Sequence, residues 1–182
     1  RVKAQGGAVL TAYLPLLHKE VAVVASHLNG RGHVTALHLG GGSPSMLRPE
    51  DLVALGALVR AQFATSADFE FSIEIDPNDM TEDRYDAFAA AGVNRVSIGV
   101  QDFDPKVQKA INRPQTFEAT KAVVEGMRKR GVRSINLDVL YGLPHQTAQT
   151  IERTIDLALS LNPDRLALFG YAHVPWMKTN QK

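Results

Sequence analysis

The sequence predicts an α/β protein built from repeated strand–helix units with parallel strands. Short apolar runs rich in β-branched residues alternate along the chain with amphipathic helical stretches. The interiors of these runs are almost continuously hydrophobic, as strands covered on both faces must be. Right-handed crossovers between such strands produce either an open sheet or a barrel. The chain contains no linker or low-complexity tract, so we expect a single domain over residues 1–182.

The first half of the chain is expected to contain three helices and two strands. A helical pattern covers residues 10–28, and an apolar strand follows at 34–39. The next helix begins near Pro49, which suits a first helical turn. Its apolar stripe consists of Leu52, Leu55, Val59 and Phe63. A second strand at 69–75 and a third helix at 81–91, closed by Gly92, complete this half.

The second half of the chain repeats the alternation with three strands and two helices. Strands are expected at 95–100, 134–140 and 165–169. Between them lie helices at 116–130 and 147–160, and the first of these is opened by a threonine that suits the N-cap position. Since this β/α pattern begins on a helix, the strand that should precede it is missing. We therefore expect the chain to be a fragment of a larger barrel or sheet.

Composition and charge exclude several classes of protein. Twenty basic and nineteen acidic side chains leave a net charge of +1, so neither nucleic acid nor a membrane surface is an expected partner. There is no apolar run long enough to cross a bilayer and no secretory signal core, which favours a cytoplasmic location. The chain has no cysteine, and its histidines form no zinc-binding pair, so no metal ligand is assigned.

Small and polar residues follow the first two predicted strands, where parallel β/α folds bind ligands. The first strand ends in the glycine triplet 40–42 and Ser43, which is either a tight turn or a close backbone approach to a ligand. The second strand ends with Glu74 and Asp76 on one face. Glu74 can bind a diol or an ammonium group, or form a salt bridge to a neighbouring strand. Because two isoleucines flank Glu74, we expect its carboxylate to be partly desolvated.

The later strands end in the same way. Gln101 and Asp102 follow the third strand, Asp138 lies in the fourth, and Ala172 follows the fifth. Arg113 lies in the loop between the third strand and the next helix, and it places a cation near the carboxyl ends of the strands. The coincidence of five polar strand ends predicts one pocket for a polyfunctional ligand. No P-loop or dinucleotide-binding glycine motif occurs, which disfavours nucleoside triphosphates and nicotinamide cofactors.

Two histidines lie close to these strand ends. His38 lies within the first strand, one residue before the end of the apolar run, and we interpret it as a core histidine with a hydrogen-bond partner. His173 lies beyond the fifth strand at the rim, where a functional role is as reasonable as a structural one.

The motifs together resemble those of the oxygen-independent coproporphyrinogen III oxidases, a family of radical S-adenosylmethionine (SAM) enzymes. The resemblance covers nearly the whole chain in order. It is carried by GGGSPS at 40–45, IEIDP at 73–77, RVSIGVQDF at 95–103, INR at 111–113, NLDVLYGLP at 136–144, LNPDR at 161–165 and YAH at 171–173.

The resemblance implies most of a radical-SAM partial barrel, a TIM-like (β/α)6 fold. It implies oxidative decarboxylation of two propionates of coproporphyrinogen III to vinyl groups, giving protoporphyrinogen IX in haem biosynthesis. The family uses a four-iron, four-sulfur cluster, two SAM molecules and an electron donor. By this resemblance Gly41 and Glu74 contact the cluster-bound SAM, whereas no catalytic residue is assigned. The second SAM is contacted by Gly42, Ser43, Gln101, Arg113, Asp138 and Ala172.

One departure from the family pattern matters for activity. The family's cluster is held by a cysteine motif, which is expected upstream of Arg1, and a further SAM contact is expected beyond Lys182. Without cysteine the chain alone should be inactive, so the oxidase activity is expected of a longer, monomeric parent protein. A haem chaperone on the same scaffold and an ordinary barrel enzyme without radical chemistry remain alternatives.

Overall fold

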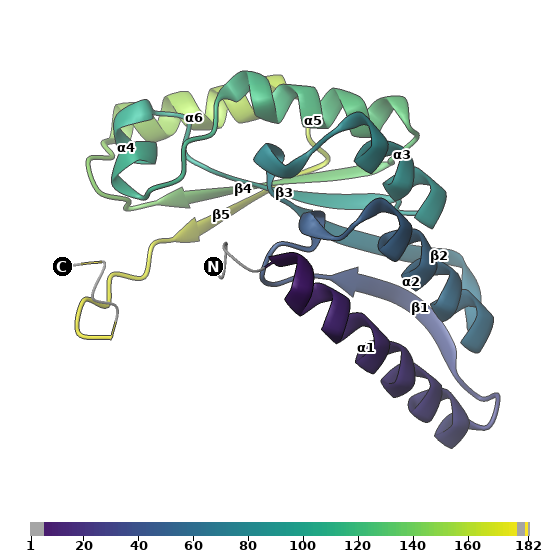
Figure 1. Ribbon diagram of the computed structural model, residues 1–182. Helices are drawn as coiled ribbons and strands as arrows, with labels where there is room; N and C mark the ends of the chain where they lie inside the picture. The colour runs from purple at the N-terminus through teal and green to yellow at the C-terminus, as the bar shows by residue number, and fades with distance from the viewer. Residues whose placement is uncertain (1–5, 178–180, 182) are drawn as a thin grey trace.

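The chain forms one open sheet of five parallel strands, as the computed structural model shows for residues 6–177 and 181 (Figure 1). The strand order is β1-β2-β3-β4-β5, so each strand pairs with its neighbours in the sequence. The strands are β1 (His33–Leu39), β2 (Ala64–Ile75), β3 (Arg95–Gln101), β4 (Ser134–Tyr141) and β5 (Arg165–Gly170). The sheet curls into a half-barrel, which confirms the predicted partial (β/α) barrel.

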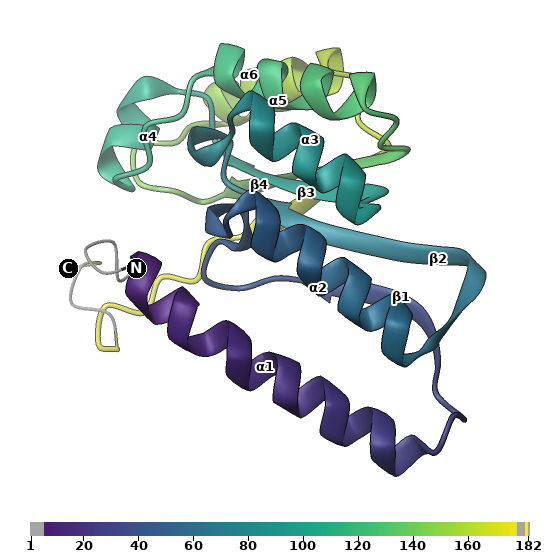
Figure 2. The ribbon, with the colours of Figure 1, turned by 45° about the vertical axis from the view of Figure 1, so that its right-hand side comes forward.

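The helices cover the outer, convex face of the sheet (Figures 1 and 2). They are α1 (Gly6–Leu28), α2 (Pro49–Gln62), α3 (Glu82–Ala91), α4 (Pro105–Ala110), α5 (Phe117–Lys129) and α6 (Ala148–Ser160). Two short 3-10 turns lie at Pro44–Met46 and Pro77–Asp79. The predicted N-cap at Thr116 is confirmed, and Thr147 caps α6 in the same way, because each hydroxyl accepts a backbone N–H of the first turn.

The hydrophobic core lies between the sheet and these helices. Strand β3 alternates strictly: Val96, Ile98 and Val100 are buried against the helices, whereas the residues between them are only half-buried. The expectation that both faces of the strands are covered is therefore wrong. Helices cover one face, and the concave face carries mainly polar side chains.

Helix α1 begins at Gly6, four residues before its predicted start, and two further elements differ from the prediction. Strand β2 begins at Ala64, five residues before the predicted start, because its first half pairs with β1 around a register irregularity. Helix α4 was not predicted, although Asp104 followed by Pro105 is a strong start signal. The Asp104 carboxylate accepts the backbone N–H groups of Lys106 and Val107 at 2.8 and 3.2 Å. Its six residues are too few to show helical periodicity.

We expect Asp164 to stabilise the edge of the sheet opposite the strand ends. Its Oδ2 accepts the Ile135 N–H at 2.8 Å and pairs with Arg128 Nη2 at 2.6 Å. The Ile135 hydrogen bond, with help from Arg128, lowers the pKa of Asp164. The Asp164→Asn variant should lose about 0.5–1 kcal/mol of unfolding free energy at neutral pH, because solvent screens this half-exposed pair.

The pH dependence of this loss follows from the direction of the pKa shift. A carboxyl group with a lowered folded-state pKa stabilises the fold above its unfolded pKa. That stabilisation disappears as the pH falls through the folded-state pKa. Urea titrations of the wild type and Asp164→Asn should therefore differ at neutral pH and converge below about pH 4. A difference that persists in acid would contradict this role of the carboxylate.

Candidate functional site

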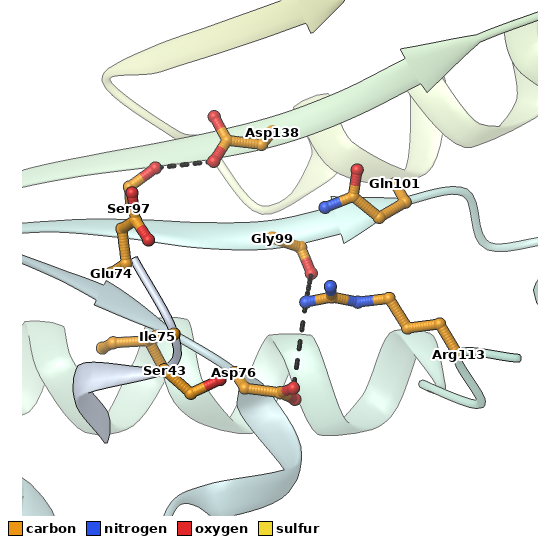
Figure 3. A pocket seen from close by; sticks show the side chains of 10 residues that line it. Ser43, Glu74, Ile75, Asp76, Ser97, Gly99, Gln101, Arg113 and Asp138 are labelled. Carbon is orange, nitrogen blue, oxygen red and sulfur yellow. Dashed lines mark hydrogen bonds and ion pairs between the residues drawn. The ribbon is translucent and has the colours of Figure 1, made fainter. Parts of the chain in front are cut away.

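A polar cavity of about 340 Å³ opens at the carboxyl ends of β1 to β4 (Figure 3). It lies on the concave side of the sheet, where the strand-end loops converge. Its lining residues are Gly42, Ser43, Glu74, Ile75, Asp76, Ser97, Gly99, Gln101, Arg113 and Asp138. Six of the eight residues predicted to bind a cofactor are among them.

The loop after β1 presents its backbone to this cavity. Gly41 and Gly42 have φ values of 73° and 74°, and Ser43 has a φ of 105°. A Cβ added at either glycine would meet no atom within 4 Å, so conformation rather than crowding favours glycine here. The Gly41 N–H donates to Glu74 Oε2 at 2.9 Å. Gly41 therefore adjoins the cavity through Glu74, although it is not among the lining residues.

Glu74 is more exposed than the sequence suggested. Its side chain is 49% exposed, whereas the flanking Ile73 and Ile75 are 0% and 3% exposed. The two isoleucines do not shield Glu74, because strand alternation sends both of them to the helix-covered face and Glu74 to the concave face. Its partial desolvation in a longer parent protein stays a prediction.

The interpretation of His38 as a core residue is also wrong. Its Nδ1 lies 2.8 Å from Ser72 Oγ, so the expected polar partner exists, but the side chain is 56% exposed. Strand β1 is an edge strand of the described sheet, and its concave face is uncovered. His38 Nε2 lies 3.8 Å from Glu74 Oε1, which places a titratable group beside that carboxylate.

Asp138 belongs to a polar triangle on β3 and β4. Its Oδ2 accepts the Ser97 hydroxyl at 2.8 Å, and its Oδ1 accepts Asn136 Nδ2 at 2.7 Å. Asn136 also donates to Ser97 Oγ at 2.8 Å. These bonds fix the direction of the carboxylate before any ligand arrives.

Arg113 reaches the cavity from the loop after α4. Its Nη2 donates to the Gly99 carbonyl at 3.2 Å and lies 4.0 Å from Asp76 Oδ2 (Figure 3). The end of α4 sets its position, because the Arg113 N–H donates to the Gln108 carbonyl at 2.9 Å. Gly99 leaves the necessary space: a Cβ there would lie 2.8 Å from Arg113 Nη2 and 3.0 Å from Gln101 Nε2.

Ala172 is not brought together with the other predicted residues. It lies beyond the end of β5, is exposed, and lines neither of the two cavities described here. Its carbonyl accepts Gln181 Nε2 at 3.1 Å. The chain leaves the sheet at Gly170, so the strand-end rule that places the other residues does not extend to Ala172. His173 lies in the same segment, with its ring 6.3 Å from that of Tyr171.

A second cavity of about 470 Å³ lies deeper on the concave face and was not predicted. It shares Glu74, Ser97 and Asp138 with the first cavity. An ion pair between Glu70 and Arg95, with Oε2 and Nη1 3.0 Å apart, forms part of its wall. A sequence signal for it exists, since the alternate positions of β3 from Arg95 to Gln101 are polar or small.

The charges in the first cavity favour a particular kind of ligand. Glu74, Asp76 and Asp138 outnumber the single guanidinium of Arg113 among the described lining residues. Such a site suits a ligand with cationic groups, hydroxyl groups and one carboxylate. Within residues 6–177 and 181, no cluster of three or more histidine, aspartate or glutamate side chains is arranged to hold a metal ion. No helix in that part of the chain has the length and apolar character to cross a membrane.

Comparisons with known proteins agree with this architecture. The sequence profile of the radical SAM superfamily matches residues 12–158. "Coproporphyrinogen III oxidase, anaerobic 1" of Cereibacter sphaeroides is 48% identical over 175 residues, which are 96% of this chain and 39% of that protein. The oxygen-independent coproporphyrinogen III oxidase of Helicobacter pylori strain J99 is 42% identical over 93% of this chain and 37% of its own.

Solved structures show the same relationship. The coproporphyrinogen III oxidase of Escherichia coli, described as a radical SAM enzyme, superposes with a TM-score of 0.87 and 41% identity over 94% of this chain and 39% of its own. The chain thus spans about two fifths of the length of these relatives. Since the superfamily profile covers most of the residues, the chain belongs to the radical SAM superfamily.

Proposed function

We propose that this chain is the SAM-binding part of an oxygen-independent coproporphyrinogen III oxidase. The whole enzyme would convert two propionate side chains of coproporphyrinogen III to vinyl groups. The observation that carries the proposal is the convergence of Gly42, Ser43, Glu74, Gln101, Arg113 and Asp138 on one cavity. The relatives that are named as such oxidases are 41–48% identical to this chain and support the same reaction.

The chemistry of the cavity fits SAM. SAM carries an ammonium, a sulfonium, a ribose diol and one carboxylate, and in this family it is the source of the radical that removes a hydrogen from the substrate. Glu74 and Asp138 offer acceptors for the ammonium and hydroxyl groups, and Arg113 offers a guanidinium for the carboxylate. The backbone of Gly41 and Gly42 allows a close approach.

We assign the predicted residues to two SAM molecules. Gly41 and Glu74 would contact one molecule, and Gly42, Ser43, Gln101, Arg113 and Asp138 the other. The assignment is supported by the two adjoining cavities, which share Glu74 and Asp138 and together offer space for two ligands of this size. Ala172 remains a proposed contact of the second molecule that would require the segment after β5 to approach the cavity.

The residues of this chain do not fit a cysteine-held iron–sulfur cluster. The 182 residues include no cysteine, and thiolates are the usual ligands of such clusters. We therefore assign the chain's own residues to binding and orienting SAM alone.

Two measurements test the proposal. Isothermal titration of the 182-residue chain with SAM should show saturable binding. S-adenosylhomocysteine, which lacks the sulfonium charge, should bind more weakly to this acidic site. No saturable binding of SAM would contradict the proposal.

The reaction itself is tested in a chimaera. This chain replaces the matched 175 residues of the Cereibacter sphaeroides relative, and anaerobic formation of protoporphyrinogen IX is followed. Retained activity supports the oxidase. Tight haem binding without decarboxylation would instead support the haem chaperone.

The Gly99→Ala variant should weaken SAM binding without unfolding the chain. The new Cβ would lie within 3.0 Å of the Arg113 and Gln101 side chains, which must move away. Gly99 does not have a positive φ, so alanine strains no backbone. We expect about a fivefold loss of affinity, equivalent to about 1 kcal/mol, with an unchanged melting temperature. The matched control is Gly131→Ala, at a helix end remote from the cavity, which should lower the melting temperature and leave SAM affinity unchanged.

A further inference from the structure

Asp102 is a fully buried carboxylate that lines neither cavity. It follows Gln101 directly at the end of β3. Its Oδ1 accepts the Asp104 N–H at 2.6 Å and the Thr154 hydroxyl at 3.0 Å. Its Oδ2 accepts Gln146 Nε2 at 2.5 Å. These three hydrogen bonds hold the carboxylate rigidly, because each buried donor would be left without an acceptor if the carboxylate moved.

The donors come from elements that are distant in the sequence. Thr154 belongs to α6, and its Oγ1 also accepts the Phe103 N–H at 3.2 Å. Gln146 belongs to the loop after β4, where its Oε1 accepts the Gly142 N–H at 2.6 Å. Asp102 therefore joins the loop after β3 to the loop after β4 and to α6.

The residue held beside this connection has an unfavourable backbone conformation. Gln101 has a φ of 66°, and the Asp102 N–H donates to the Val100 carbonyl at 2.9 Å, which closes a three-residue turn around Gln101. Such turns with positive φ are rare and strained for residues other than glycine. The pairing of β3 with β4 is irregular at the same place, between Gly99 and Gln101. The turn is also what brings the Gln101 side chain to the cavity wall (Figure 3).

We propose that Asp102 is a positioning residue, which holds Gln101 in its left-handed turn and thereby directs the Gln101 amide into the SAM cavity. This inference rests on the proposed function for its ligand. Strain at a site persists only when surrounding contacts over-determine the geometry, and the buried carboxylate with its three donors supplies those contacts. Asp102 acts through Gln101 and does not touch the ligand.

The Asp102→Asn variant tests this role with little change in shape. The amide has one acceptor fewer and places an NH₂ group among donors. The Asp102 carbonyl, which accepts Gln108 Nε2 at 2.8 Å, is retained, so α4 and Arg113 keep their support. We expect SAM to bind about tenfold more weakly, and the Cα and Cβ chemical shifts of Gln101 to lose their left-handed signature.

A matched control separates positioning from stability. Asp164→Asn also removes a carboxylate that accepts a backbone N–H, but at the opposite edge of the sheet. Both variants should lower the melting temperature, whereas only Asp102→Asn should change the SAM dissociation constant. If Asp102→Asn does not fold, Thr154→Val removes one donor to the same carboxylate and should weaken SAM binding in the same direction.

A double-mutant cycle shows whether Asp102 acts through Gln101. In a Gln101→Ala background, the Asp102→Asn change should alter SAM affinity by less than about twofold. An equal effect in both backgrounds, or an unchanged affinity in Asp102→Asn alone, would overturn the inference. If the wild type binds no SAM, the proposed function fails. The Gln101 chemical shifts then decide the inference separately: a left-handed turn that persists in Asp102→Asn overturns it.

Discussion

The Arg113→Met variant should bind SAM about 30- to 100-fold more weakly than the wild type. Arg113 is the one cationic side chain among the described residues that line the first cavity. A charge-assisted hydrogen bond contributes roughly 1.5–3 kcal/mol, and 1.4 kcal/mol corresponds to about tenfold in affinity. The Arg113 side chain is only 24% exposed, so solvent would compete weakly with a bound carboxylate. Isothermal titration with SAM measures the loss.

Two controls identify the group that Arg113 binds. 5′-Methylthioadenosine lacks the amino-acid carboxylate, so its affinity should be the same for the wild type and Arg113→Met. The Arg113→Lys variant keeps the charge but loses the planar fork, and should recover only part of the affinity. An equal loss for both ligands would show that Arg113 supports the cavity through Gly99 and Asp76 and does not bind the carboxylate.

The fold was predictable because the information lies in local patterns. Apolar runs, the threonine cap at Thr116 and the helix-ending Gly92 are signals that each span a few residues. The positions of the strands and long helices follow from these signals. The strand-end rule then placed Gly42, Glu74 and Gln101 in one cavity, since parallel strands end at the same edge of the sheet.

Features that depend on the surroundings of a residue were not predictable in the same way. Glu74 has apolar neighbours in the sequence but polar ones in space, because the strand turns alternate residues to opposite faces. His38 is exposed because its strand is at the edge of the described sheet. The role of Asp102 depends on Gln146 and Thr154, which are 44 and 52 residues away in the sequence.

The polar concave face explains why a sequence so apolar in its strands holds a hydrophilic site. In β2, β3 and β4 one face of the strand is buried in the core, and polar side chains of the other face line the two cavities. The bonds among Ser97, Asn136 and Asp138 keep that second face ordered without a hydrophobic partner. The two faces can therefore be tested separately. The free energy of unfolding reports on the buried face, and the affinity for SAM reports on the concave face.

The Glu74→Gln variant should bind SAM about tenfold more weakly while the loop after β1 keeps its conformation. The glutamine oxygen can still accept the Gly41 N–H, which the wild-type Oε2 accepts at 2.9 Å. The variant loses the negative charge and turns an NH₂ group toward the ligand, where a cationic ammonium would be repelled. Because Glu74 is half-exposed, the effect should lie at the lower end of what a charge-assisted bond contributes.

The control for net charge is Glu82→Gln, which removes the same charge from an exposed position on α3 outside both cavities. Its SAM affinity should equal that of the wild type. Titration with 5′-methylthioadenosine then assigns the bond: an affinity unaffected by Glu74→Gln indicates that Glu74 binds the ammonium, whereas an equal loss indicates the ribose diol. Unchanged SAM affinity in Glu74→Gln would show that the carboxylate serves only to anchor the Gly41 loop, because that contact alone survives the substitution.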